Sequence, residues 1–190
     1  MKYDPQRHHR RSIRLRGFDY TQAGAYFVTV VTQQRARLFG DVVDGEMRSN
    51  DAGRVVAYTW HDLPNHVGGI TLDAFVVMPN HVHGIIIITD NVYVGAGSVG
   101  AGSEPAPTME PAPTEPTHKK RHALPEIVRQ FKTFSARRIN QLRGTPGTVV
   151  WQRNYYEHII RNQAALERIR AYIAHNPRRW DSDRENLHRC

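Results

Sequence analysis

Residues 78–84 read Met-Pro-Asn-His-Val-His-Gly, and four isoleucines follow directly at 85–88. Side chains alternate between the two faces of a β-strand, so residues two positions apart share a face. His81 and His83 are therefore predicted to lie on one face of a strand, with Val82 on the other. Two imidazoles held side by side on a strand form half of a typical divalent-metal site.

The apolar patterns around this stretch predict an α+β domain. Strands are expected over 26–32, 70–77 and 81–89, a hairpin over 38–48 and a mixed strand over 149–160. Helices are expected from Asn50 or Asp51 to His61, from Leu124 to Gly144, and from Gln163 to His175 before Pro177. The long elements then follow the order βαββαβ. This order predicts a ferredoxin-like fold with an antiparallel sheet, an extra hairpin and a C-terminal helix that carries Tyr172.

The composition suits a globular protein. The chain has 190 residues, 39% of them apolar, which is enough for one domain over residues 1–190. No apolar run approaches the ~20 residues of a membrane span, and the basic N-terminus lacks the apolar core of a signal peptide. The single cysteine, Cys190, excludes a disulfide framework and a cysteine-based zinc site. We therefore expect a soluble cytoplasmic protein with no membrane partner.

Two segments concentrate the positive charge. The net charge is +8, which favours a polyanionic partner such as DNA, RNA or a membrane surface. Residues 1–16 carry six Lys and Arg against one Asp, and residues 118–143 carry eight against one Glu. Basic runs are often only solvated faces, but apolar residues are interleaved with these charges and can anchor them. We interpret the first segment as part of a basic N-terminal arm over residues 1–20.

Residues 91–117 break the pattern of apolar periods. Gly-Ala and Pro-Ala-Pro-Thr elements recur in this stretch. Such a composition buries too little apolar surface to offset the entropy cost of ordering. We expect a flexible insertion that only tethers its neighbours.

The last predicted helix carries a second group of candidate site residues. Tyr172 and Asn176 are four positions apart and so share a helical face. A phenolate oxygen can attack a phosphodiester and form a covalent intermediate. Asn176 offers a neutral oxygen ligand beside two imidazoles, a set that suits Mg²⁺ or Mn²⁺, although histidine-rich sites also admit zinc. Plainer interpretations remain open: Tyr172 as a core aromatic and Asn176 as a helix terminator before Pro177.

Four segments together resemble the single-tyrosine HUH transposases, including the REP-associated tyrosine transposases and those of the insertion-sequence 200/605 group. They run from Gly24 to Thr29, Phe75 to Gly84, Val150 to His158 and Tyr172 to Pro177. The combination of His-Val-His with Trp-Gln-Arg and Tyr-Ile-Ala-His-Asn-Pro is highly specific. The resemblance covers nearly all of residues 10–180 outside the insertion.

The resemblance implies cleavage of single-stranded DNA by a tyrosine, which leaves a 5′-phosphotyrosine and a free 3′-hydroxyl. The hydroxyl of another strand then reverses the reaction and joins ends without ATP. By motif position, Tyr172 is the nucleophile, and His81, His83 and Asn176 are the metal ligands. Tyr155 and Tyr156 match the strand before the nucleophile's helix, so we assign them to packing or DNA contact.

The resemblance also implies a hairpin or palindromic DNA partner and a location at the bacterial nucleoid in the cytoplasm. A basic groove is expected for the single strand. The candidate DNA contacts are Arg10, Arg11, Arg14, Lys132, Arg137, Arg138 and Arg153. Related enzymes occur both as dimers with shared active sites and as monomers, so a homodimer is possible.

Three alternatives remain open at this point. One is a relaxase or replication-initiator nuclease with the same chemistry. Another is a ferredoxin-like nucleic-acid-binding module whose sheet aromatics stack on bases without catalysis. The third is a domesticated, active enzyme that acts on dispersed chromosomal repeats.

Overall fold

The computed structural model describes residue 15 and residues 17–90 and 122–186. The predicted insertion at 91–117 lies outside the described residues, as does most of the predicted basic arm, including Arg10, Arg11 and Arg14. Among the helices that are described, none combines the length and apolar character needed to cross a bilayer.

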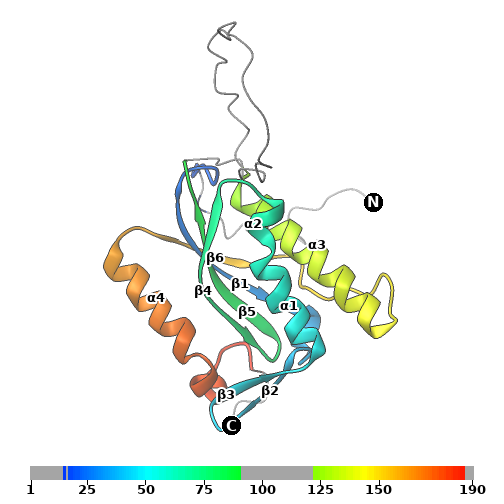
Figure 1. Cartoon of the computed structure of the whole chain (residues 1–190). Helices are drawn as coiled ribbons and strands as arrows, with labels where there is room; N and C mark the ends of the chain where they lie inside the picture. Colours follow the sequence, from blue (N-terminus) through cyan, green and yellow to red (C-terminus); the bar gives the residue numbers. More distant parts are fainter. Residues whose placement is uncertain (1–14, 16, 91–121, 187–190) are drawn as a thin grey trace, which may run out of the picture.

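A four-stranded antiparallel sheet forms the centre of the molecule (Figure 1). Its strands are β1 (Gly24–Val31), β4 (Ile70–Met78), β5 (His81–Ile88) and β6 (Tyr156–Ile160), in the spatial order β4-β5-β1-β6. A separate hairpin consists of β2 (Gly40–Val43) and β3 (Glu46–Ser49). The predicted α+β class, antiparallel sheet and extra hairpin are confirmed.

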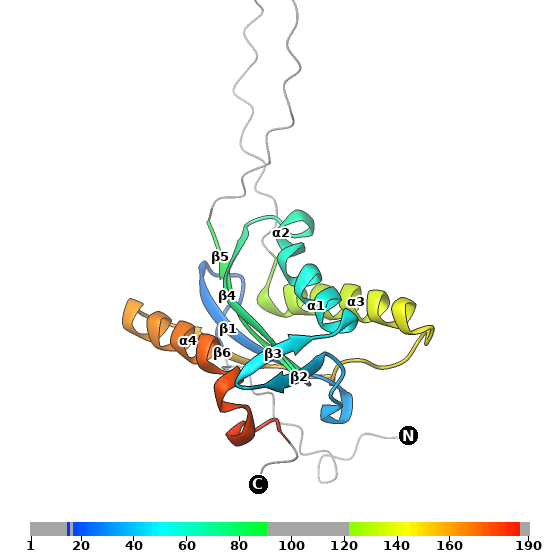
Figure 2. The ribbon, with the colours of Figure 1, turned by 60° about the horizontal axis from the view of Figure 1, so that its bottom comes forward.

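The helices lie on both faces of the sheet (Figure 2). One face carries α1 (Asp51–His61), the short α2 (Leu63–His66) and α3 (Leu124–Arg143). The opposite face carries α4 (Gln163–His175) and the 3₁₀ helix η2 (Pro177–Ser182). A second 3₁₀ turn, η1 (Gln33–Arg35), follows β1. The predicted C-terminal helix that carries Tyr172 is therefore present.

Local sequence signals account for several element ends. Asp44 and Gly45 both have positive φ in the β2–β3 turn, as a tight two-residue hairpin turn requires. The Asn50 side chain accepts a hydrogen bond from the Gly53 amide and caps α1, as Asn162 caps α4 through Ala165.

The larger core lies between the sheet and α1 and α3. Val28, Val82 and Ile86 point into it from the two central strands. Trp60 from α1 stacks on Phe75 at 4.7 Å and lies directly over Gly84. A Cβ at Gly84 would stand 2.3 Å from the Trp60 ring, so the glycine of the His-Val-His-Gly motif is required by packing on the face opposite the histidines.

One expectation needs correction. The strand predicted over 149–160 is a regular strand only at 156–160. Before it, the chain makes a single isolated antiparallel bridge beside the end of β1, between Thr32 and Trp151, where the Gln152 amide donates to the Val31 carbonyl. In that segment the Lys132 ammonium donates to the Gln152 and Arg153 carbonyls, and the Trp151 indole donates to Ser135. At the other end, α4 spans Gln163–His175 as predicted, and Pro177 begins η2, where its missing N–H costs nothing in a first turn.

The packing over Gly84 yields a stability prediction. Gly84→Ala is expected to lower the free energy of unfolding in urea by about 3 kcal/mol, because the new methyl collides with a buried ring. In a Trp60→Leu background the same change should cost much less. Equal costs in both backgrounds would contradict the packing account.

Candidate active site

His81 and His83 lie on the face of β5 opposite the larger core. In the register between β1 and β5, Val31 lies opposite His81 and Thr29 lies opposite His83. Both histidines are buried, and their Nε2 atoms are 3.0 Å apart. The same-face arrangement predicted from the strand period is present.

Asn80 sets the orientation of the first imidazole. Its Nδ2 donates to the carbonyl oxygens of Arg35 (3.1 Å) and Glu185 (2.8 Å), so its Oδ1 points to His81 Nδ1 at 2.8 Å. An amide oxygen only accepts, so Nδ1 of His81 carries the proton. The lone pair on Nε2 is then directed to His83 and to any ion between them.

Thr29 and Phe27 hold the second imidazole from the neighbouring strand. The Thr29 hydroxyl lies 2.8 Å from His83 Nδ1, and the Phe27 ring stacks on the imidazole at 5.4 Å. A hydroxyl can donate or accept, so this contact is compatible with either neutral form of His83.

Burial keeps both imidazoles neutral. Desolvation lowers the pKa of His81 from 6.5 to about 3. Desolvation also lowers the pKa of His83 well below its usual value, and the nearby His81 adds to this effect. Neutral imidazole is the form that binds a metal ion.

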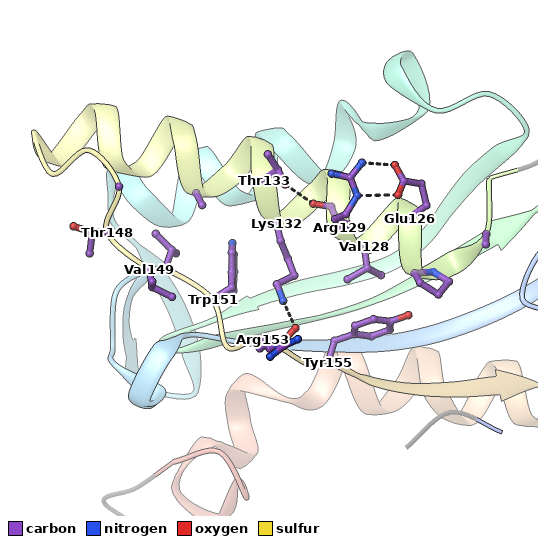
Figure 3. Close-up of a pocket in the computed structure, with 15 residues that line it drawn as sticks. Glu126, Val128, Arg129, Lys132, Thr133, Thr148, Val149, Trp151, Arg153 and Tyr155 are labelled. Carbon is purple, nitrogen blue, oxygen red and sulfur yellow. Dashed lines mark hydrogen bonds and ion pairs between the residues drawn. The ribbon is translucent and has the colours of Figure 1, made fainter. Parts of the chain in front are cut away.

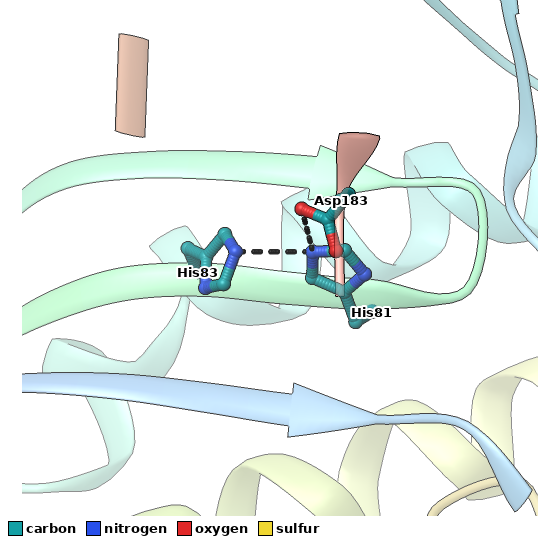
Figure 4. A group of neighbouring side chains, drawn as sticks. All are labelled: His81, His83 and Asp183. Atoms are coloured by element: carbon teal, nitrogen blue, oxygen red, sulfur yellow. Dashed lines mark hydrogen bonds and ion pairs between the residues drawn. The ribbon is translucent and has the colours of Figure 1, made fainter. Parts of the chain in front are cut away.

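Asp183 joins the pair, and sequence reasoning missed it. Its Oδ2 lies 4.0 Å from His81 Nε2, and the three ligand atoms of this group all lie within 4.8 Å of one another (Figure 4). Asp183 follows η2 directly in an irregular segment. No strand or helix period points from it to the histidines, so spacing alone gave no signal.

The donor set fits a divalent cation. Two ligand atoms about 2.1 Å from one ion and at right angles to each other lie about 3.0 Å apart, which matches the two Nε2 atoms. Two neutral nitrogens and a carboxylate oxygen suit Mn²⁺ and Mg²⁺, and zinc also accepts such ligands.

Asn176 is buried at the junction between α4 and η2. Its Oδ1 is buried and has no hydrogen-bond partner. An unpaired buried carbonyl oxygen is costly, which supports a role as a metal ligand. Its side chain lowers the pKa of the Tyr172 phenol, so the predicted pair on one helical face lies close together.

Tyr172 reaches the histidines from α4. Its hydroxyl lies 3.3 Å from His83 Nε2, and its ring packs edge-on against His83 and Phe27. The side chain is 39% exposed, so Tyr172 is a surface aromatic over the histidines and not a core residue. Burial raises the pKa of the Tyr172 phenol, the charge of Asp183 raises it further, and the hydrogen bond with Asn176 opposes both.

A bulge in β4 holds the tyrosine's helix. The register of β4 against β5 shifts between Leu72 and Phe75. Within this irregularity Asp73 accepts from Arg170 at 2.8 and 2.5 Å, two residues before Tyr172 on α4. The hydrogen bond from Arg170 lowers the pKa of the Asp73 carboxyl. A small apolar cluster around Phe27, Ile85 and Ile173 completes the contact.

The predicted basic contacts on α3 lie on the other face of the sheet. Lys132 and Arg153 line a cavity of about 710 Å³ between α3 and residues 147–155 (Figure 3). Arg137 is exposed on α3.

Arg138, also on α3, instead donates to Thr59 and Asp62 and stacks over Tyr58, which ties α3 to α1. The structure therefore does not bring these predicted DNA contacts to Tyr172.

The tyrosines of the Asn154-Tyr155-Tyr156 segment have different positions. Tyr155 packs against the larger core, where it is partly buried. Tyr156 is 53% exposed on the histidine face and packs edge-on against Phe27 at 6.2 Å. The predicted packing is therefore present for Tyr155, and DNA contact by the exposed Tyr156 stays a prediction.

No protein-family model matches the chain. An uncharacterized protein of Haemophilus influenzae is 37% identical over 185 residues, which cover 96% of each chain. The chain belongs to the same family as that protein.

The fold of this chain is similar to that of a solved tyrosine transposase. The structure of a REP-associated tyrosine transposase bound to a REP hairpin matches 87% of this chain and 73% of its own, with a TM-score of 0.51 and 17% identity. A putative transposase from Deinococcus radiodurans matches 86% of this chain and 96% of its own, with a TM-score of 0.44 and 18% identity. The first of these likenesses, together with the histidine pair, confirms the predicted resemblance at the level of the fold.

The lowered pKa of His81 predicts a pH-dependent stability. The unfolded chain protonates this histidine near pH 6.5, and the folded chain does so only near pH 3. The contribution of His81 to the free energy of unfolding is therefore complete above pH 6.5 and is lost as the pH falls from 6.5 to 3. In chelator, between pH 7.5 and pH 5, the free energy of unfolding should fall by about 2 kcal/mol from His81 alone. His81→Gln should remove that part of the slope, and an unchanged slope would contradict the account.

The Asp73–Arg170 pair predicts how firmly α4 is docked. Arg170→Gln is expected to speed amide hydrogen exchange across residues 163–175 while lowering the global free energy of unfolding only slightly, because the pair is partly exposed. Arg168→Gln, an exposed change on the same helix, is the matched control. Equal exchange in the two variants would show that the pair does not hold the helix.

Proposed function

We propose that this protein is a metal-dependent endonuclease and strand transferase of single-stranded DNA, a transposase that forms a 5′-phosphotyrosine intermediate. The observation that carries the proposal is the position of the Tyr172 hydroxyl, 3.3 Å from the Nε2 of a buried histidine in a His-x-His pair. The fold shared with a REP-associated tyrosine transposase supports it. We also propose that the core is ferredoxin-like. The βαββαβ order of the long elements and the strand order β4-β5-β1-β6 support this assignment.

The proposed reaction is a phosphoryl transfer in two reversible halves. The Tyr172 oxygen attacks the phosphorus of the scissile phosphodiester, and the bond from phosphorus to the 3′-oxygen breaks. The phenol gives up its proton and the leaving 3′-oxygen gains one, so a free 3′-hydroxyl and a 5′-phosphotyrosine result. A 3′-hydroxyl from another strand then attacks the phosphotyrosine, releases Tyr172 and joins the two strands.

His81, His83 and Asn176 are the residues proposed to hold the cation. A bound Mg²⁺ or Mn²⁺ polarises the scissile phosphate and offsets the charge that develops on it. The protein's own part is to present neutral imidazole lone pairs, through the Asn80 and Thr29 contacts, at a position next to the nucleophile. The unpartnered Oδ1 of Asn176 supports its place in this set.

Single-stranded DNA fits the surroundings of the tyrosine. The Tyr172 side chain is only 39% exposed, so a strand must bring its phosphate into the site. Tyr156 presents an aromatic ring on the same face, and such rings stack on unpaired bases. The exposed Arg179 lies close enough for its charge to lower the pKa of Tyr172, which places positive charge near the proposed phosphate position.

The remaining DNA contacts are proposed for the hairpin. Arg137 and Arg153 lie on the α3 face, and they suit a duplex that extends away from the tyrosine. Arg138 and Lys132 are weaker candidates, because Asp62 pairs with Arg138 and the Lys132 ammonium donates to two backbone carbonyls. The arginines Arg10, Arg11 and Arg14 remain proposed contacts. Binding of a hairpin without any cleavage would favour the alternative, a nucleic-acid-binding module.

The central prediction concerns Tyr172. With Mn²⁺ and a hairpin that carries a single-stranded flank, the wild-type protein should form a covalent DNA adduct visible on a denaturing gel. Tyr172→Phe should abolish the adduct and keep DNA binding within about threefold, because only the attacking oxygen is lost. Tyr156→Phe is the matched control and should still form the adduct.

Two results would count against the assignment. One is an adduct in Tyr172→Phe that disappears in Tyr156→Phe or Tyr155→Phe. The other is equal cleavage of the flanked hairpin and of a perfect duplex of the same length.

A further inference from the structure

Resting on the proposed metal-dependent function, we propose that Asp183 is a further ligand of the same cation, so that the ion ties the C-terminal end of the described chain to the histidine strand. Residues 177–186, called the C-terminal strap below, comprise η2 and the four residues after it. The motif that predicted the other ligands contains nothing from this strap.

The strap is docked beside the histidines by contacts that do not involve the metal site. The Arg35 guanidinium pairs with the Glu185 carboxylate at 2.7 Å. Trp180 is buried, its backbone carbonyl accepts from Asn186, and the Arg37 guanidinium lies 5.6 Å from its ring. These contacts bring Asp183 to the site without any ion.

The two carboxylate oxygens of Asp183 have different surroundings. Oδ1 accepts a hydrogen bond from the Glu185 amide at 2.7 Å, which orients the carboxylate within the strap. Oδ2 points to His81 Nε2 at 4.0 Å (Figure 4). That separation is too long for a hydrogen bond but suits two atoms that share an ion.

The distances set how far the group must move to hold one ion. Ligand atoms about 2.1 Å from a shared cation lie at most about 4.2 Å apart. The two Nε2 atoms and the His81–Asp183 pair already satisfy this limit, at 3.0 and 4.0 Å. With those two separations kept, three bonds of about 2.1 Å to one ion require the third separation to be at most about 3.7 Å. The widest separation in the group is at most 4.8 Å, so it has to shorten by up to about 1 Å.

The charges favour a cation at this position. Burial lowers the pKa values of both histidines, so they bring no positive charge to the site. Asp183 is only 9% exposed, so its carboxylate lies in a buried position beside the two imidazoles. A carboxylate oxygen together with two neutral nitrogens is a donor set that divalent cations accept.

Asn80 contacts both His81 and the C-terminal strap. One end of its amide accepts from the His81 imidazole, and the other donates to the Glu185 carbonyl in the strap. The residue that orients the histidine ligand therefore also holds the segment that carries Asp183. Metal binding and docking of the strap are expected to strengthen each other.

Calorimetric titration of the full chain with MnCl₂ tests the proposal without using activity. Asp183→Asn keeps the shape and the Oδ1 acceptor but removes the charge, and should weaken Mn²⁺ binding at least tenfold. Asp181→Asn, an exposed change in the same strap, should stay within twofold of the wild type. In wild type and Asp181→Asn, but not in Asp183→Asn, saturating Mn²⁺ should slow amide exchange across residues 177–186.

The outcomes separate this proposal from the function it rests on. If Asp183→Asn binds Mn²⁺ as the wild type does while His81→Ala does not, Asp183 is not a ligand and the proposed function stands. If the wild type binds no Mn²⁺ at millimolar concentration, both this proposal and the metal-dependent reaction are overturned. Circular dichroism and melting in chelator confirm that each variant folds.

Discussion

The register between β1 and β5 is the constraint on which the site depends. It places Thr29 opposite His83 and Val31 opposite His81, on the face away from the larger core. A slip of one residue would turn both imidazoles into that core and Val82 out of it. The register is held from the other face, where the rings of Trp60 and Phe75 pack over Gly84. Packing on one side of the sheet therefore fixes the positions of the two histidines on the other side.

The two faces of the sheet are built differently, and this difference suits a catalytic role. Toward α1 and α3 the sheet buries a large continuous core that includes Trp60, Phe131 and Trp151. Toward α4 it buries a much smaller cluster, and one partly exposed ion pair, Asp73–Arg170, supplements it. The helix that carries Tyr172, the proposed nucleophile, is therefore attached more lightly than the strand that carries the histidines, while one chain still holds the tyrosine and both histidines together.

Regular periods made much of this arrangement predictable. A period of two placed His81 and His83 on one face, and a helical spacing of four placed Tyr172 beside Asn176. Contacts made by irregular segments were not predictable in the same way. Asp183 reaches the histidines from a turn after η2, and Asn80 orients His81 through carbonyls distant in sequence. Arg138 was predicted to contact DNA, but it pairs with Asp62 in the turn between α1 and α2, and a pair between segments so far apart in sequence leaves no local signal.

The most direct measurement is the position of the covalent link in the wild-type protein. Trypsin digestion of the protein–DNA complex formed in Mn²⁺, followed by mass spectrometry, separates the candidate tyrosines, because cleavage after Arg170 and Arg178 isolates Tyr172 from Tyr155 and Tyr156. The account predicts a 5′-phosphonucleotide on the peptide of residues 171–178. A nucleotide on the peptide of residues 154–161, or no linked peptide from a reaction in which the DNA has been cleaved, would contradict it.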